Sequence, residues 1–268
     1  MDFFASVLRI LDTSMTTPVP YGWFHLLWLG ITLFSAVLLC KFRPNPRKTL
    51  LVVAVAVILL EIYKQVNYTF GYEGGITADY QWYAFPFQFC STPMYIGLLA
   101  GLTRPGKFHD ALCAYLATFA VFAGAAVMVS PSDVFISTIG INVQTMICHG
   151  SMVSIGVYLL QSGYVKREHK TILKAAPVFA VCVTIAIVLN EIAYRTGLLK
   201  TETFNMFFVS PYCDPSLPVY SLVQKVVPFP WCLVLYILGF TTAAYIILLL
   251  SMGIGAIADK LVKRKISV

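Results

Sequence analysis

The sequence predicts an all-α fold, a polytopic membrane bundle of about seven transmembrane helices with its N-terminus outside and its C-terminus in the cytoplasm. Composition predicts the class, since 59% of the 268 residues are hydrophobic and 12% are charged, with a mean hydropathy of +0.79. A soluble domain carries about 25% charged residues, so this chain cannot cover a water-facing surface. The apolar residues also form segments near the roughly 20 residues that cross a bilayer.

The predicted elements follow in order along the chain. Residues 1–22 form an N-terminal segment whose apolar residues recur at helical spacing, which predicts an amphipathic helix at the outer interface. A transmembrane domain over 23–252 contains the spans, and 253–268 is a basic cytoplasmic tail. The predicted spans are 23–40, 49–68, 82–102, 110–130, 142–161, 171–194 and 229–252.

Basic residues alternate between the loops and predict the orientation. The 41–48 loop holds four Lys and Arg, whereas the 69–81 loop holds only Glu73 and Asp79 as charged residues. Later basic loops and the tail fall on the same side as 41–48, which the positive-inside rule assigns to the cytoplasm. The net charge of +7 therefore indicates a multi-pass protein of the cell membrane and no nucleic-acid partner.

The sequence lacks the signature motifs of several function classes. The chain has no glycine-rich phosphate loop, HExxH, GxSxG or cysteine-rich metal spacing, so we expect neither a metal nor a cofactor. Of the seven cysteines, six lie in or at the spans, where a free cysteine behaves as a small apolar residue.

Cys90 and His149 are the candidate reactive residues. They lie in the third and fifth predicted spans, and counting 1.5 Å per helical residue from the outer ends puts both roughly 10–12 Å deep. A histidine at membrane depth is a functional candidate by default, and a cysteine beside a histidine is a simple source of thiolate. A packing cysteine in a proline-kinked helix and an interhelical clasp by the histidine are the structural alternatives.

Other polar residues are predicted at the same depth and indicate a polar cavity open toward the outer leaflet. In the cysteine's own segment, Pro93 is expected to free the Phe89 carbonyl, and Gln88 or the backbone to hold an oxyanion. Glu61 or Glu191 would orient the histidine, although Glu61 and Lys64 can equally form a structural ion pair. The remaining supporting residues are Asn142, Thr145 and Asn190.

The sequence resembles one known family over essentially its whole length. FPFQFC in span three, the histidine of span five, and NMFFVSPYCDPSLP followed by PFPW resemble the YwaF-like integral membrane proteins of bacteria, whose animal relatives are described as cysteine-centred phospholipid acyltransferases. The resemblance implies that Cys90 is the nucleophile and His149 its partner. This sequence departs from the family in the residues around the cysteine. The family's choice of substrate therefore does not carry over to this chain.

The predicted function is therefore an integral membrane acyltransferase that moves a fatty acyl chain between phospholipids and lysophospholipids through a cysteine thioester. Phe87, Phe89, Asn205 and Phe207 are expected to contact the lipid. A lipid hydrolase using the same pair is a close variant. A proton-coupled transporter with Glu61, Lys64, His149 and Glu191 as its relay is the alternative from another class, and a non-enzymatic scaffold is a third.

Overall fold

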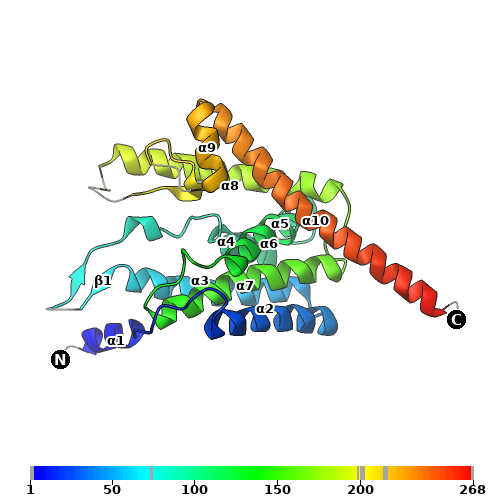
Figure 1. Ribbon diagram of the computed structural model, residues 1–268, viewed down its shortest axis with the longest axis horizontal. Helices are drawn as coiled ribbons and strands as arrows, with labels where there is room; N and C mark the ends of the chain where they lie inside the picture. The colour runs from blue at the N-terminus through cyan, green and yellow to red at the C-terminus, as the bar shows by residue number, and fades with distance from the viewer. Residues whose placement is uncertain (1–2, 73–74, 198, 200–202, 214–216, 267–268) are drawn as a thin grey trace.

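The computed structural model describes residues 3–72, 75–197, 199, 203–213 and 217–266 (Figure 1). Helices dominate these residues, and one short antiparallel ribbon pairs β1 (Phe70–Gly71) with β2 (Thr77–Ala78). Single 3-10 turns cover Trp82–Ala84 and Met206–Phe208. The α-helices are α1 (Phe3–Leu11), α2 (Trp23–Phe42), α3 (Pro46–Asn67), α4 (Thr92–Leu102), α5 (Lys107–Ala117), α6 (Phe119–Val129), α7 (Ile139–Gln161), α8 (Lys170–Arg195), α9 (Pro218–Val226) and α10 (Trp231–Ile266).

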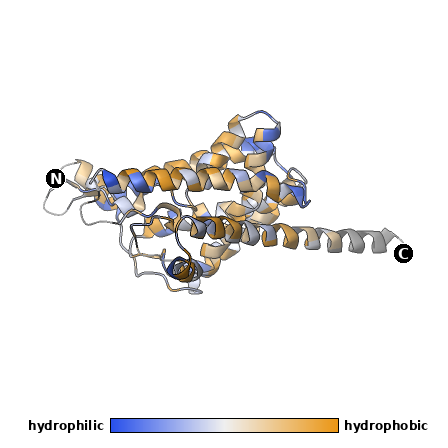
Figure 2. Cartoon of the chain, turned by 90° about the horizontal axis from the view of Figure 1, so that it is seen from above, coloured by the Kyte–Doolittle hydropathy of each residue, from blue (hydrophilic) through white to orange (hydrophobic). Residues whose placement is uncertain are grey.

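Six helical stretches in the described residues are long and apolar enough to cross a membrane, so the chain is a multi-pass membrane protein. They match six of the predicted spans, with α5 and α6 together forming one stretch over Lys107–Val129. Figure 2 shows apolar residues along the long helices and hydrophilic ones mainly toward the two ends of the bundle. In Figure 1, α2 and α3 lie on one side of the bundle and α8, α9 and α10 on the other, with α4 to α7 between them.

The prediction of a continuous helix over 82–102 is wrong. The chain makes a short turn at Trp82–Ala84, stays non-helical through Cys90, and begins α4 only at Thr92. Pro93 stands in the first turn of α4, where its missing N–H costs no hydrogen bond. The Phe89 carbonyl is not freed, because it accepts a hydrogen bond from the Thr92 hydroxyl at 3.1 Å. The depth deduced from helical rise therefore does not apply to Cys90.

This partly extended segment nevertheless runs antiparallel along α3. The Gln65 side-chain amide donates to the Ala84 carbonyl at 2.9 Å near one end of α3. Near the other end, a Cβ on Gly101 would lie 2.9 Å from the Leu51 Cβ. Gln65 and Leu51 are separated by roughly 21 Å of helical rise, so residues 84–101 cover most of the length of α3. Because glycine has no side chain, it lets two helices approach each other closely.

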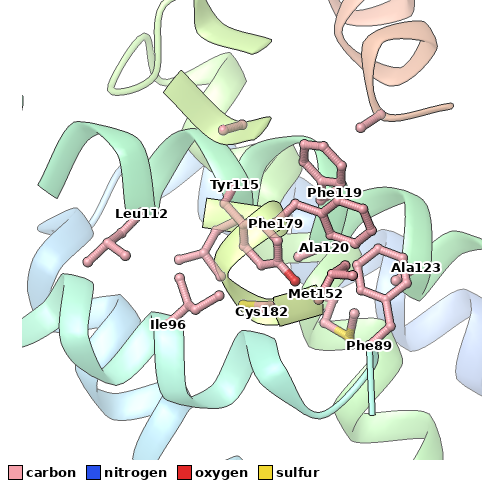
Figure 3. Packing of buried hydrophobic residues seen from close by; sticks show 14 of the residues in the cluster. Phe89, Ile96, Leu112, Tyr115, Phe119, Ala120, Ala123, Met152, Phe179 and Cys182 are labelled. Carbon is pink, nitrogen blue, oxygen red and sulfur yellow. The ribbon is translucent and has the colours of Figure 1, made fainter. Parts of the chain in front are cut away.

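An aromatic cluster fixes the residue before the candidate nucleophile. Phe89 packs with the ring of Phe179 at 5.2 Å, and Phe179 stacks on Phe119 at 4.6 Å (Figure 3). Phe119 and Phe179 are fully buried. Helices α6 and α8 therefore hold the chain on the N-terminal side of Cys90.

The two ends of the chain are helical. The predicted N-terminal helix is present as α1, and its last carbonyl, on Leu11, accepts hydrogen bonds from Tyr63 at 2.6 Å and Asn67 at 3.3 Å. At the other end, α10 continues without a break past residue 252, where the tail was predicted to begin. The location of α1 at a membrane interface stays a prediction.

The orientation in the membrane also stays a prediction, and cysteine labelling tests it. Ile76→Cys in the 69–81 loop is expected to react with an impermeant thiol reagent added outside intact cells. Lys48→Cys, which is equally exposed, is expected to react only after permeabilisation. The opposite result would place the N-terminus in the cytoplasm.

Candidate active site

The structure brings Cys90 and His149 to the wall of one cavity of about 790 Å³. This site cavity, as we call it, is bounded by the segment before α4, by α6, by the loop after α6, by the 203–213 loop and by α10. Its volume lies in the range of small-molecule sites, about 300–1,000 Å³.

His149 is held in the form that a general base requires. Its side chain is buried on α7, and Nδ1 lies 2.7 Å from the Thr145 carbonyl oxygen. Because a carbonyl only accepts, Nδ1 carries the proton, and Nε2 is left with a free lone pair. Among the described residues this Nε2 has no hydrogen-bond partner. A buried polar atom without a partner is costly, and a ligand or water bound in the site cavity would satisfy this one.

The other buried histidines have a partner on each ring nitrogen. His25 Nδ1 accepts from the Tyr21 amide at 2.8 Å, and its Nε2 donates to the Met128 carbonyl at 2.8 Å. This arrangement ties the start of α2 to the end of α6. His25 is therefore a structural histidine, unlike His149.

Cys90 lies two residues before the start of α4, next to the N-cap Ser91. The positive end of a helix dipole favours a nearby thiolate. The Cys148 thiol contacts the Cys90 carbonyl at 3.7 Å, which joins this segment to α7 one residue before His149. Cys148 and Cys90 share a separate cavity of about 40 Å³, and Cys148 is not among the residues that line the site cavity. Of these two cysteines, only Cys90 lines the site cavity together with His149.

A direct cysteine–histidine contact lies elsewhere in the bundle. The Cys113 sulfur is 3.4 Å from His109 Nε2, and both residues are buried on α5. The same Nε2 bonds the Tyr164 hydroxyl at 2.7 Å, while Nδ1 contacts the Thr103 hydroxyl at 3.3 Å. Neither Cys113 nor His109 lines the site cavity. We assign this cluster a structural role.

Gln88 and Asn190 clamp the loop that borders the site cavity. The Gln88 amide donates to the Asn205 carbonyl at 3.2 Å and accepts from the Phe207 amide at 3.0 Å. Asn190 forms a matching pair with the backbone of Met206, at 2.8 and 3.1 Å. These bonds hold Phe207 in the left-handed region, with φ of 57°, which a bulky residue adopts only under constraint. Gln88 thus positions this loop with one of its two amide N–H donors, and because it also lines the site cavity its expected oxyanion role stays a prediction.

The predicted lipid-contacting residues divide into two groups. Phe89 and Asn205 line the site cavity, as does Phe208. Phe87 and Phe207 instead pack on one another at 6.0 Å outside its lining, and Phe207 is fully buried. Both have a packing role, and their expected contact with substrate stays a prediction.

Glu61 does not contact His149, contrary to the expected orienting role. Its carboxylate accepts from Lys64 at 2.9 Å, Gln65 at 2.7 Å and Gln144 at 3.1 Å. The structural ion pair is thus the arrangement present. Gln144 directly precedes Thr145, whose carbonyl holds the histidine, so Glu61 fixes α7 beside the site.

Glu191 and Asn142 also lie outside the site cavity. Glu191 is at the exposed end of α8, where it pairs with Arg195 and accepts from the Tyr212 hydroxyl at 2.7 Å. Asn142 bonds the Ile136 amide at 3.0 Å and carbonyl at 2.7 Å, and so closes the loop before α7. These contacts show that both residues hold loops and helix ends. The shared depth of the polar residues stays a prediction.

Sequence reasoning missed most of the site cavity wall. Phe122, Ala123 and Ala126 of α6 face Tyr236 and Phe240 of α10 across it. Nothing in the sequence separates these residues from other apolar residues of a span. Asp133 carried a weak signal, as the only charged residue of the 131–141 loop, and it also lines the site cavity.

Gly124 allows α6 to approach the backbone of His149. A Cβ at Gly124 would lie 2.6 Å from the His149 carbonyl oxygen and 2.9 Å from the Met152 Cβ. We expect Gly124→Ala to lower the free energy of unfolding by about 1–3 kcal/mol, the usual cost of overpacking. Thermal unfolding in detergent micelles measures this. Gly30→Ala on α2, with nothing within 4 Å of its Cβ, is the control and is expected to unfold like the parent. Equal unfolding of the two variants would contradict the packing argument.

Comparison with known proteins gives one match. Residues 20–252 match the model of the TMEM164 family, which covers all six long apolar stretches apart from the end of the last. No curated protein and no solved structure matches the chain.

Proposed function

Since the chain belongs to the TMEM164 family of membrane proteins, we propose that it is an acyltransferase acting within the membrane, which moves a fatty acyl chain between phospholipids and lysophospholipids through a thioester on Cys90. The resemblance of FPFQFC and of the span-five histidine to the YwaF-like proteins supports this assignment.

The observation that carries the proposal is the unpartnered Nε2 of His149 in a cavity that Cys90 also lines. Nucleophilic catalysis uses a base whose other nitrogen is fixed by a carbonyl, together with a cysteine that opens onto the same cavity. The contacts of His25 and His109 leave no comparable free nitrogen.

In the first step, His149 Nε2 accepts the thiol proton and the Cys90 thiolate attacks the ester carbonyl carbon of a donor phospholipid. The bond from that carbon to the glycerol oxygen breaks. The oxygen takes the proton from His149, and a lysophospholipid leaves with the acyl chain retained as a thioester.

In the second step, a lysophospholipid hydroxyl gives its proton to His149 and attacks the thioester carbon. The carbon–sulfur bond breaks, and the Cys90 sulfur recovers the proton. Both substrates dissolve in the bilayer, and the apolar cavity wall limits the entry of water that would compete as acceptor. Water in the acceptor's place would make the protein a hydrolase.

Trapping the intermediate tests the proposal. Purified protein is incubated in vesicles with a phospholipid carrying one isotopically labelled acyl chain and no acceptor. Peptide mass spectrometry is expected to find the labelled chain on Cys90, and hydroxylamine is expected to remove it. Added lysophospholipid should then receive the label, whereas release as free fatty acid would identify a hydrolase.

Two cysteine variants provide matched controls. Cys148→Ala and Cys113→Ala are expected to form the adduct as the parent does, because neither cysteine lines the site cavity. An adduct on either of these cysteines, or none on Cys90, would overturn the proposal.

A further inference from the structure

A second cavity, of about 360 Å³, adjoins the site cavity between α6, α9 and α10. The two share Phe122, Leu217, Tyr236 and Phe240 as wall residues. We call this second space the tail pocket. A ligand bound at Cys90 thus has a continuous wall leading away from the reactive groups.

The tail pocket offers nothing to a polar ligand. Its lining is aliphatic and aromatic, and the hydroxyls in it belong to two tyrosines. The Tyr236 hydroxyl donates to the Phe207 carbonyl at 2.8 Å, and the Tyr220 hydroxyl contacts the Cys232 sulfur at 3.6 Å. With both hydroxyls occupied, the pocket matches a hydrocarbon and disfavours water.

One face of α10 lines the tail pocket. Tyr236, Gly239, Phe240 and Ala243 follow helical spacing and form one stripe on α10. Tyr236 and Phe240 face both cavities, whereas Gly239 and Ala243 line only the tail pocket. Gly239 and Ala243 are thus the small residues that α10 contributes to the tail pocket alone.

From this continuity we infer that the tail pocket holds the acyl chain of the ester whose carbonyl meets Cys90, and that Gly239 sets the length of chain accepted. This inference rests on the proposed function. In a phospholipid the ester carbonyl separates a polar head from a hydrocarbon chain. The site cavity, lined by Cys90, His149, Asn205 and Asp133, suits the first part, and the tail pocket suits the second.

Gly239 allows a clean test, because a Cβ there would meet nothing within 4 Å. Gly239 is exposed and lines the tail pocket, so a larger side chain there displaces no neighbour and is expected to narrow the pocket. Replacing a helical glycine does not weaken the helix. Gly253 on the same helix has equally open surroundings and is not among the residues lining either cavity. Gly253→Leu is therefore the matched control for Gly239→Leu.

In the first experiment, vesicles contain equal amounts of phospholipids that differ only in acyl-chain length, and the chains bound to Cys90 are quantified by mass spectrometry. Gly239→Leu is expected to shift the adducts about tenfold toward shorter chains, which is within the discrimination that a few methylenes provide. Gly253→Leu is expected to keep the parent distribution. An unchanged distribution in Gly239→Leu, or the same shift in Gly253→Leu, would overturn the assignment.

The second experiment does not need catalysis. A phosphatidylcholine with a diazirine at the end of one acyl chain is photocrosslinked to the Cys90→Ala variant in vesicles. Crosslinks are expected in residues 235–243 of α10 and 220–223 of α9, and they should fall in Gly239→Leu/Cys90→Ala. If these crosslinks form but the parent protein forms no thioester, the assignment of the tail pocket stands and acyl transfer is rejected. A thioester on Cys90 with crosslinks elsewhere would reject the pocket alone.

Discussion

Replacing His149 by alanine is expected to slow acyl transfer by about 10²–10⁴-fold, the range that a positioned general base contributes. Cys90→Ser is expected to lose at least as much, because a serine hydroxyl is a far weaker nucleophile than a thiolate. The double variant should be no slower than the slower single variant, since residues that act as a unit are not additive. Transfer of a labelled chain to lysophospholipid in vesicles measures all three.

The control for this prediction is stability. His149→Ala removes the bond from Nδ1 to Thr145 and the packing of a buried ring, while Nε2 forms no hydrogen bond to the described residues. This variant is expected to fold with a lowered unfolding temperature, and Cys90→Ser is expected to unfold near the parent. Undiminished transfer by a folded His149→Ala protein would show that this histidine is not the base.

The second large effect is expected on stability, at the ion pair between buried Glu61 and partly buried Lys64. Glu61→Leu leaves Lys64 without its carboxylate and takes the acceptor from Gln65 and Gln144. Breaking a buried pair from one side costs about 3–5 kcal/mol of unfolding free energy. Unfolding in detergent micelles measures it, and transfer activity is expected to fall too, because Gln144 adjoins the carbonyl that orients His149.

Two further variants serve as controls for the effect of Glu61→Leu. Glu61→Leu/Lys64→Met leaves no buried charge and is expected to recover much of the lost stability. Glu191→Gln, in the exposed pair with Arg195, is expected to change unfolding little. If Glu61→Leu unfolds like Glu191→Gln, the buried pair does not support α7 as we argue.

Local properties of the chain account for the fold elements predicted from sequence. The length and hydropathy of a segment decide whether it suits a membrane, and these are visible without any partner. Six of the predicted spans and the helix over Phe3–Leu11 follow from such properties. The third predicted span failed because composition does not distinguish a helix kinked at Pro93 from a helix that begins beside it.

The sequence by itself determined the membrane class, most helix positions, and Cys90 and His149 as the residues to consider together. Only the tertiary structure decided what each polar group binds. Glu61 bonds Gln144 of α7 instead of orienting His149, and Gln88 bonds a loop more than a hundred residues away. A buried polar group must find a partner wherever the packed chain supplies one. That choice depends on which distant segments meet, and so neither hydropathy nor spacing contains it.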